Sequence, residues 1–238
     1  MKKLFLALLG FAFVSVNAQP LDEIIQKYSA TLGGLDAFSK IKTAKITGTL
    51  TTQGQDFPMT VQIINGHAAR TDVEVMGSSV IRAYKDGKAW TQNPFAGIAT
   101  PTEVGGAELA EYKVQAMMGS PLMDYKALGS KVELVGQEDV AGIKTYKIKL
   151  TGKEDGKVTT YYVSTKDYVL VKSETDRQIQ GQAVNVETFY SDIKDFGGAK
   201  FFMTRTSKIN GEAFQTATFT NIELNATIDE KIFDMPKS

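Results

Sequence analysis

The chain of 238 residues contains no cysteine and a single histidine, His67. Without cysteine there is no disulfide, no thiol chemistry and no lipid-modified cysteine. His67 follows Gly66 in an expected turn, where a lone histidine is more often a surface residue than a metal ligand or a base. No HxxxH or CxxC spacing is present, and no Gly-x-Ser-x-Gly elbow accompanies the histidine. These absences argue against metal, thiol and serine-histidine chemistry.

The chain also lacks a net charge, with 27 basic and 27 acidic residues. Removing Lys2 and Lys3 with a leader would leave 25 basic against 27 acidic residues, a net charge of −2. This balance argues against nucleic acid or an anionic membrane surface as a charge-driven partner.

Paired carboxylates remain the one route to acid-base hydrolysis, because a sheet protein with 27 acidic residues brings some of them together. Asp72 and Glu74, or Glu133 and Glu138, are better interpreted as solvent-facing positions. No phosphate-cradling glycine loop is present either. We therefore expect no enzyme, no cofactor and no metal.

A leader is expected at residues 1–18. Lys2 and Lys3 precede an apolar run from Leu4 to Val16, and Val16-Asn17-Ala18 supplies small residues for cleavage. The alternative is a membrane anchor, but the run is too short to cross a hydrocarbon core of roughly 30 Å comfortably. We expect a protein exported to a bacterial periplasm, with residues 19–238 forming a single domain.

Most of the chain predicts antiparallel strands. Phe57, Met59, Val61 and Ile63 alternate with Pro58, Thr60 and Gln62, which gives one apolar and one polar face. Runs of β-branched and aromatic residues recur to the end of the chain, separated by turns such as Asn210-Gly211. We expect a mainly β fold of about ten or eleven strands, curled into a barrel, a half-open barrel or a sandwich. The stretch 93–106 is expected to be irregular.

Two stretches predict helices. Leu21, Ile24, Ile25, Tyr28 and Leu32 recur at helical spacing before Gly33-Gly34, with a second short helix after them. This stripe has two interpretations, a lid over an apolar cavity or ordinary packing of a helix on a sheet. Residues 108–118 predict another helix, whose Met117 and Met118 either plug a variable cavity or fill gaps in the core.

Residues 86–95 resemble a known family. The order Asp-Gly-Lys, then Trp90, then Asn-Pro-Phe is similar to that of periplasmic lipoprotein carriers of the LolA/LolB type, with one residue fewer between lysine and tryptophan. Leu32-Gly33-Gly34-Leu35, the stretch 125–136 and the ending 225–236 resemble LolA-like lipoprotein-sorting paralogues of Bacteroidetes-type bacteria. The resemblance covers nearly all of residues 20–236.

The resemblance implies an incomplete, half-open antiparallel β-barrel covered by α-helices. It implies a hydrophobic cavity for the acyl chains of lipoproteins or other lipids, shuttled toward the outer membrane. Partners would be an inner-membrane release complex and an outer-membrane acceptor. We expect a soluble, unlipidated monomer, because the absence of cysteine fits the carrier rather than the lipoprotein receptor. The alternative is a non-catalytic binding or scaffold module of the same fold whose core is filled by its own side chains.

One departure from the family concerns the residues after Ile63-Ile64. Carriers have an Arg-Pro pair there, and this chain has Asn65-Gly66. Arg70, five residues on, is the candidate carrier-release residue. The expected cavity residues are apolar side chains of the sheet, the methionine pair and the aromatic residues of the motif: Leu50, Phe57, Met59, Val61, Ile63, Trp90, Phe95, Met117, Met118, Ile148, Phe201 and Phe219.

Overall fold

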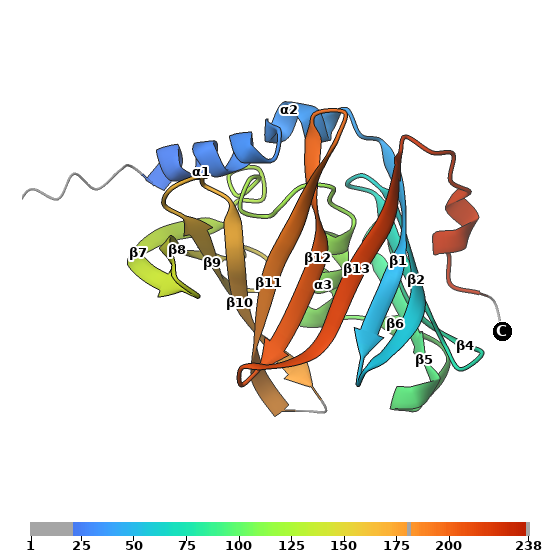
Figure 1. The fold of residues 1–238 in the computed structure, drawn as a ribbon. Coiled ribbons are helices and arrows are strands. Elements are labelled where there is room, and N and C mark those ends of the chain that lie inside the picture. Colours follow the sequence, from blue (N-terminus) through green and yellow to red (C-terminus); the bar gives the residue numbers. More distant parts are fainter. Residues whose placement is uncertain (1–20, 180–181, 237–238) are drawn as a thin grey trace, which may run out of the picture.

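The computed structural model describes residues 21–179 and 182–236, so the expected leader at residues 1–18 lies outside the described residues. Within those ranges one antiparallel sheet runs through the molecule (Figure 1). Its strands are β1 (Thr43–Thr52), β2 (Gln55–Ile64), β3 (Ala68–Val75), β4 (Ser78–Lys85), β5 (Lys88–Asn93), β6 (Ile98–Val104), β7 (Lys131–Val140), β8 (Ile143–Thr151), β9 (Val158–Ser164), β10 (Leu170–Ile179), β11 (Gln182–Phe196), β12 (Ala199–Ile209) and β13 (Glu212–Leu224).

The order of the strands explains the shape. It runs β6-β5-β4-β3-β2-β1-β13-β12-β11-β10-β9-β8-β7, so each strand pairs with its sequence neighbour except where β1 meets β13. That pairing joins an N-terminal half, β1 to β6, to a C-terminal half, β7 to β13. Because β6 and β7 lie at opposite edges, the sheet stays open. The expected half-open antiparallel barrel is confirmed.

The helices lie on the concave side of the sheet (Figure 1). They are α1 (Leu21–Thr31), α2 (Gly34–Ser39) and α3 (Ala107–Gln115), and short 3-10 turns form η1 (Pro94–Ala96) and η2 (Glu230–Phe233). Asp22 and Glu23 in the first turn of α1 favour the helix electrostatically. The chain between the edge strands β6 and β7 passes through α3, which contacts β3, β4 and β5.

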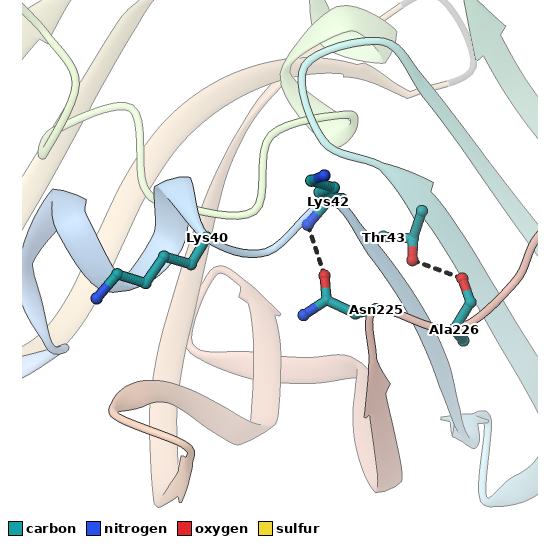
Figure 2. Close-up of a pocket in the computed structure, with 5 residues that line it drawn as sticks. All are labelled: Lys40, Lys42, Thr43, Asn225 and Ala226. Atoms are coloured by element: carbon teal, nitrogen blue, oxygen red, sulfur yellow. Dashed lines mark hydrogen bonds between the residues drawn. The ribbon is translucent and has the colours of Figure 1, made fainter.

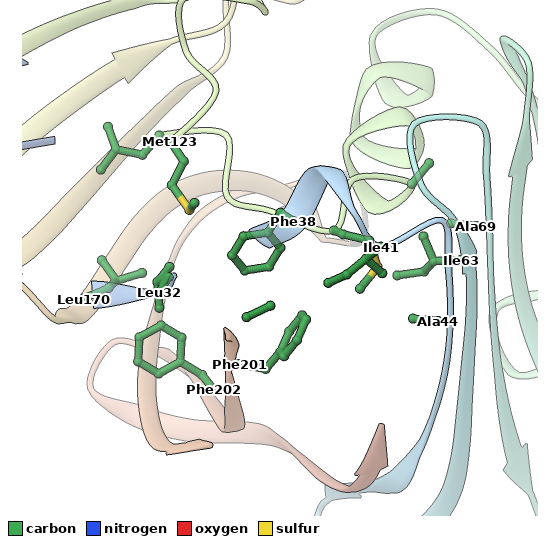
Figure 3. Close-up of a cluster of buried hydrophobic side chains, with 14 of the residues drawn as sticks. Leu32, Phe38, Ile41, Ala44, Ile63, Ala69, Met123, Leu170, Phe201 and Phe202 are labelled. Atoms are coloured by element: carbon green, nitrogen blue, oxygen red, sulfur yellow. The ribbon is translucent and has the colours of Figure 1, made fainter. Parts of the chain in front are cut away.

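The hydrophobic core lies between the concave face and this helical cover, which we define as α1, α2, α3 and residues 116–123. Its buried side chains include Ile24, Ile25 and Tyr28 from α1. The ring of Phe38 in α2 meets the ring of Phe201 in β12 edge to face, with 5.4 Å between their centroids. Figure 3 shows side chains from α2, β1 to β3 and the C-terminal half pointing into one shared interior.

Sequence and structure differ at the edge of the sheet. The stretch 93–106, expected to be irregular, contains η1 and the strand β6. β6 pairs with β5 alone, and an edge strand tolerates Pro101 because one side of the strand needs no ladder hydrogen bonds. The described residues hold thirteen strands rather than about ten or eleven. A proline therefore masked a strand in the sequence pattern.

The turns were correctly predicted. Asn210 and Gly211, between β12 and β13, have φ angles of 52° and 82°. Asp86 and Gly87, between β4 and β5, have φ angles of 47° and 81°. Two successive positive φ values are what a tight two-residue hairpin requires.

The junction between α1 and α2 rests on the hairpin between β11 and β12. The backbone N–H of Lys200 donates to the carbonyl of Leu32 at 2.8 Å. Gly33 has a φ of +104°, and a Cβ added there would lie 1.9 Å from the carbonyl oxygen of Gly198. Only glycine allows the helical cover to approach the sheet this closely.

We expect Gly33→Ala to lower the free energy of unfolding by about 2 kcal/mol or more, since left-handed strain of about 1 kcal/mol adds to the backbone overlap. Gly34→Ala is the matched control, because Gly34 also has a positive φ but no atom within 4 Å of an added Cβ. Denaturant unfolding of both variants measures the difference. Equal losses would contradict the close approach at Gly33.

Candidate functional site

The register of the strands shows which side chains face the helical cover. Ala44 and Ile63 are cross-strand partners within the core. On the same face follow the pairs Ile46 with Val61, Gly48 with Met59 and Leu50 with Phe57. A bulge in β13 at Thr220 keeps Phe219 opposite Gly48, and therefore on this face too. The apolar face predicted from alternation is thus the concave face.

The side chains on this face differ in how far they are buried. Ile46, Met59 and Ile63 are buried beneath the cover. Leu50, Phe57, Val61 and Phe219 are only half-buried. We call these four side chains the concave patch. Apolar side chains left partly uncovered on an inward-facing surface are typical of a place that receives an apolar ligand.

Three other predicted cavity residues belong to the packed core. Met118, Ile148 and Phe201 are buried within the main hydrophobic cluster. Ile63 belongs to the same cluster, and Val61 and Phe219 of the concave patch pack against it. Met117 is half-buried and lies outside that cluster.

The structure does not bring Trp90 or Phe95 to the concave face. Ala89 faces the core, so strand alternation turns Trp90 to the convex face, where it packs with Ile81 and Ala83. Phe95 lies in η1 and is 58% exposed. The tryptophan of the motif therefore supports the outer wall of the sheet rather than its interior.

Arg70 also lies on the convex face, where it holds the C-terminal segment. Its Nη1 donates to the carbonyl of Ile232 at 2.6 Å, while Nε and Nη2 bind the carboxylate of Asp72. Its guanidinium also lies over the ring of Trp90, 5.5 Å from the centroid. Trp90 Nε1 donates to the carbonyl of Phe233 at 2.9 Å. Arg70 and Trp90 thus fasten η2 to the sheet.

Asn65 stands where the family resemblance led us to expect Arg-Pro, and it ties the cover to the sheet. Its side-chain amide donates to the carbonyls of Phe38, at 3.3 Å, and Ile41, at 2.9 Å. Its side-chain oxygen accepts from the backbone N–H of Met118 at 3.1 Å. Sequence reasoning identified only a turn here, because the partners are distant in sequence and only the fold brings them together.

Two surface depressions are distinct from the concave patch. One of about 440 Å³ is lined by Lys40, Lys42, Thr43, Asn225 and Ala226 (Figure 2). In it the Lys42 backbone N–H donates to Asn225 Oδ1 at 2.8 Å, and the Thr43 hydroxyl donates to the Ala226 carbonyl at 2.6 Å. The other, of about 490 Å³, lies beside Trp90 and Phe233 on the convex face. The polar contacts in the first depression attach the chain after β13 to the start of β1.

The concave face also carries hydroxyl groups on its C-terminal half. The hydroxyls of Ser173 and Tyr190 lie 2.9 Å apart, and those of Thr188 and Ser207 lie 3.2 Å apart. Burial raises the pKa of the Tyr28 and Tyr161 phenols, so both stay neutral. The interior is therefore mainly apolar, with a group of hydroxyls on its C-terminal half.

Three of the four candidate acids, Asp72, Glu74 and Glu138, interact with groups other than a second carboxylate. Asp72 is bound by Arg70, and Glu74 accepts a hydrogen bond from Ser79. Glu138 pairs with Lys147 at 2.8 Å. His67 Nδ1 lies 2.6 Å from Asp86.

Across the residues described, no group of three or more His, Cys, Asp or Glu side chains could hold a metal ion. Over the same ranges, no helix is both long and apolar enough to cross a membrane.

This geometry defines a class, the open antiparallel half-barrel with helices on its concave side. It is the fold of the LolA superfamily. A LolA superfamily protein from Nitrosomonas europaea superposes with a TM-score of 0.57 at 10% sequence identity, over 89% of this chain and 96% of that chain. No protein-family model and no curated protein matches the sequence.

Two further solved structures share the fold. A DUF1329 family protein from Desulfovibrio piger superposes with a TM-score of 0.58 at 12% identity, over 91% of this chain and 98% of that chain. A domain named for outer-membrane lipoprotein sorting, from Vibrio parahaemolyticus, gives 0.56 at 12% identity, over 89% and 95%. The resemblance found in the sequence is therefore confirmed at the level of the fold.

We expect Arg70→Ala to loosen the C-terminal segment, because it removes the bond to Ile232 and leaves the half-buried Asp72 carboxylate without its partner. The free energy of unfolding should fall by about 2 kcal/mol. Trp90 is the only tryptophan, so its fluorescence emission should shift to the red as water reaches the ring. Lys88→Ala, which removes an exposed cation beside Trp90, is the control. An unchanged emission spectrum in Arg70→Ala would contradict this role.

Proposed function

We propose that this protein is a non-covalent carrier that binds acyl chains of lipoproteins or other lipids against its concave face. The concave patch is the observation on which the proposal rests. Leu50, Phe57, Val61 and Phe219 face the interior yet are not fully covered by the protein itself. A soluble protein rarely leaves such a surface bare unless something binds it.

The energetics suit a shuttle. Burying an acyl chain of 14 to 16 carbons stabilises a complex by on the order of 10 kcal/mol, at roughly 0.8 kcal/mol per CH₂. Transfer from a membrane to an apolar protein surface exchanges one apolar environment for another and is nearly neutral. Such a carrier can take up and release its cargo without covalent chemistry.

The packed core limits where a chain can lie. Phe38 and Phe201 fill the space beneath α2, and Tyr28 and Ile148 are fully buried nearby. A ligand therefore occupies the concave patch first and goes deeper only if α1 and α2 shift. Asn65 and the junction at Gly33 are the attachments that resist this movement.

The same packing supports a second candidate function. The continuous cluster in Figure 3 favours a binding or scaffold module whose core is filled by its own side chains. In that case the concave patch is the partly buried margin of the hydrophobic core and binds no ligand. The two candidates differ in whether lipid accompanies the protein.

We also propose where this protein acts and which complexes it meets. We propose export by the leader at residues 1–18 to a periplasm, and residues 19–238 acting as one monomeric domain. The pairing of β1 with β13, which joins both halves into one sheet, supports the single domain. An inner-membrane release complex and an outer-membrane acceptor complete the proposed pathway.

Native mass spectrometry of the protein purified from its own periplasm separates the two candidates. Adducts whose extracted masses match acyl lipids or a lipoprotein would support the carrier and identify the cargo. A clean apo mass, together with no uptake of a fluorescent fatty acid, would favour the filled module.

We expect Val61→Glu to abolish uptake of a fluorescent fatty acid, because it places a carboxylate on the concave patch beside the acyl chain. Gln62→Glu is the matched control, since strand alternation turns this neighbouring position to the convex face. Titration of both variants, with circular dichroism to check their folding, measures the effect. Equal uptake by wild type and a folded Val61→Glu variant would count against the proposal.

A further inference from the structure

Arg205 is a cation on the concave face without a carboxylate partner. The register places it opposite Tyr190 on β11 and opposite Ala217 on β13. Along β12, its neighbours on the same face are Met203 and Ser207. None of these four residues is acidic, and Arg205 makes no ion pair within the described ranges. Its side chain is exposed, so a ligand can reach it.

Two other cations, Lys172 and Arg70, are instead held by carboxylates. On the convex face Lys172 is ion-paired with Glu174 at 2.5 Å and with Glu187 at 2.8 Å. Arg70 is ion-paired with Asp72 at 2.7 Å. The guanidinium of Arg205 instead lies 5.3 Å from the ring centroid of Phe219, a member of the concave patch. An aromatic face leaves the N–H groups at the rim of the guanidinium available for an anion.

Two hydroxyl-bearing residues, Tyr190 and Ser207, neighbour Arg205 in the strand register on the side away from the concave patch. Tyr190 lies directly across from it and is hydrogen-bonded to Ser173. Ser207, two residues along, is hydrogen-bonded to Thr188. A guanidinium beside hydroxyl donors is a favourable setting for carboxylate or phosphate oxygens.

Arg205 also stands in line with the apolar surface. One cross-strand row runs from Tyr190 through Arg205, Ala217 and Leu50 to Phe57. From Arg205 to Phe57 the row crosses three strand spacings, about 14 Å. A polar end and an apolar end at this separation match a molecule with a charged head and a hydrocarbon tail.

We infer that Arg205 binds the anionic headgroup of an amphiphile whose acyl chain lies along Leu50 and Phe57. The recognised head is a carboxylate or a phosphate ester carried by the lipid itself. This inference rests on the proposed function and narrows its cargo to anionic lipids.

The test compares three ligands with the same tail, namely dodecyl phosphate, dodecanoate and dodecanol, by displacement of a neutral fluorescent lipid. Both anionic ligands should bind wild type about tenfold or more tightly than dodecanol, the change produced by one charge-assisted hydrogen bond. Arg205→Gln should lose this preference while binding dodecanol unchanged. Arg205→Lys should keep part of it, since it retains the charge but not the fork of donors.

Lys45→Gln is the matched control, because it removes an exposed cation from the convex face of β1 and should keep the preference. A preference that survives in Arg205→Gln, or dodecanol binding as tightly as the anions, would overturn the inference and leave the carrier proposal standing. Displacement by inorganic phosphate alone at the same concentrations would also overturn it. If no dodecyl ligand binds wild type, the carrier proposal itself fails.

Discussion

The structure depends on one constraint, that a curved sheet with an apolar concave face cannot remain bare in water. The chain meets it with segments that are far apart in sequence, α1 and α2 before the first strand and residues 107–123 between the two edge strands. Asn65 joins these pieces at one point, where a single side chain bonds both α2 and Met118. Leu50 and Phe57 are left only half-buried on this face, and the proposed ligand would complete their cover.

Much of the architecture could be predicted from local signals. Alternation over residues 57–63 and paired turn residues such as Asn210-Gly211 indicate strands and hairpins without any knowledge of tertiary structure. The side of the sheet to which an aromatic residue points is harder to predict from the sequence, because it depends on which neighbouring residue faces the core. Trp90 belongs to the most recognisable motif of the chain, yet Ala89 faces the interior and Trp90 supports the outer wall.

The residues that sequence reasoning missed depend on neighbours that are distant in sequence. Arg205 is unremarkable in the sequence Met-Thr-Arg-Thr-Ser, and only the register shows that its cross-strand neighbours, Tyr190 and Ala217, are not acidic. Asn65 reads as an ordinary turn residue until three partners from distant segments surround it. Strand pairing creates the environment of Arg205 and the packing of the helical cover creates that of Asn65, so composition and spacing could not reveal either.

The pairing of β1 with β13 also affects how the chain comes to be folded. β1 is the first strand of the described chain and β13 is the last. The two halves of the sheet can therefore join only after β13 has been synthesised. Sheets closed by such distant contacts form slowly, because a long loop must be ordered before the pairing stabilises it. A chain with this order of strands therefore remains incompletely folded for longer than one whose strands pair only with their sequence neighbours.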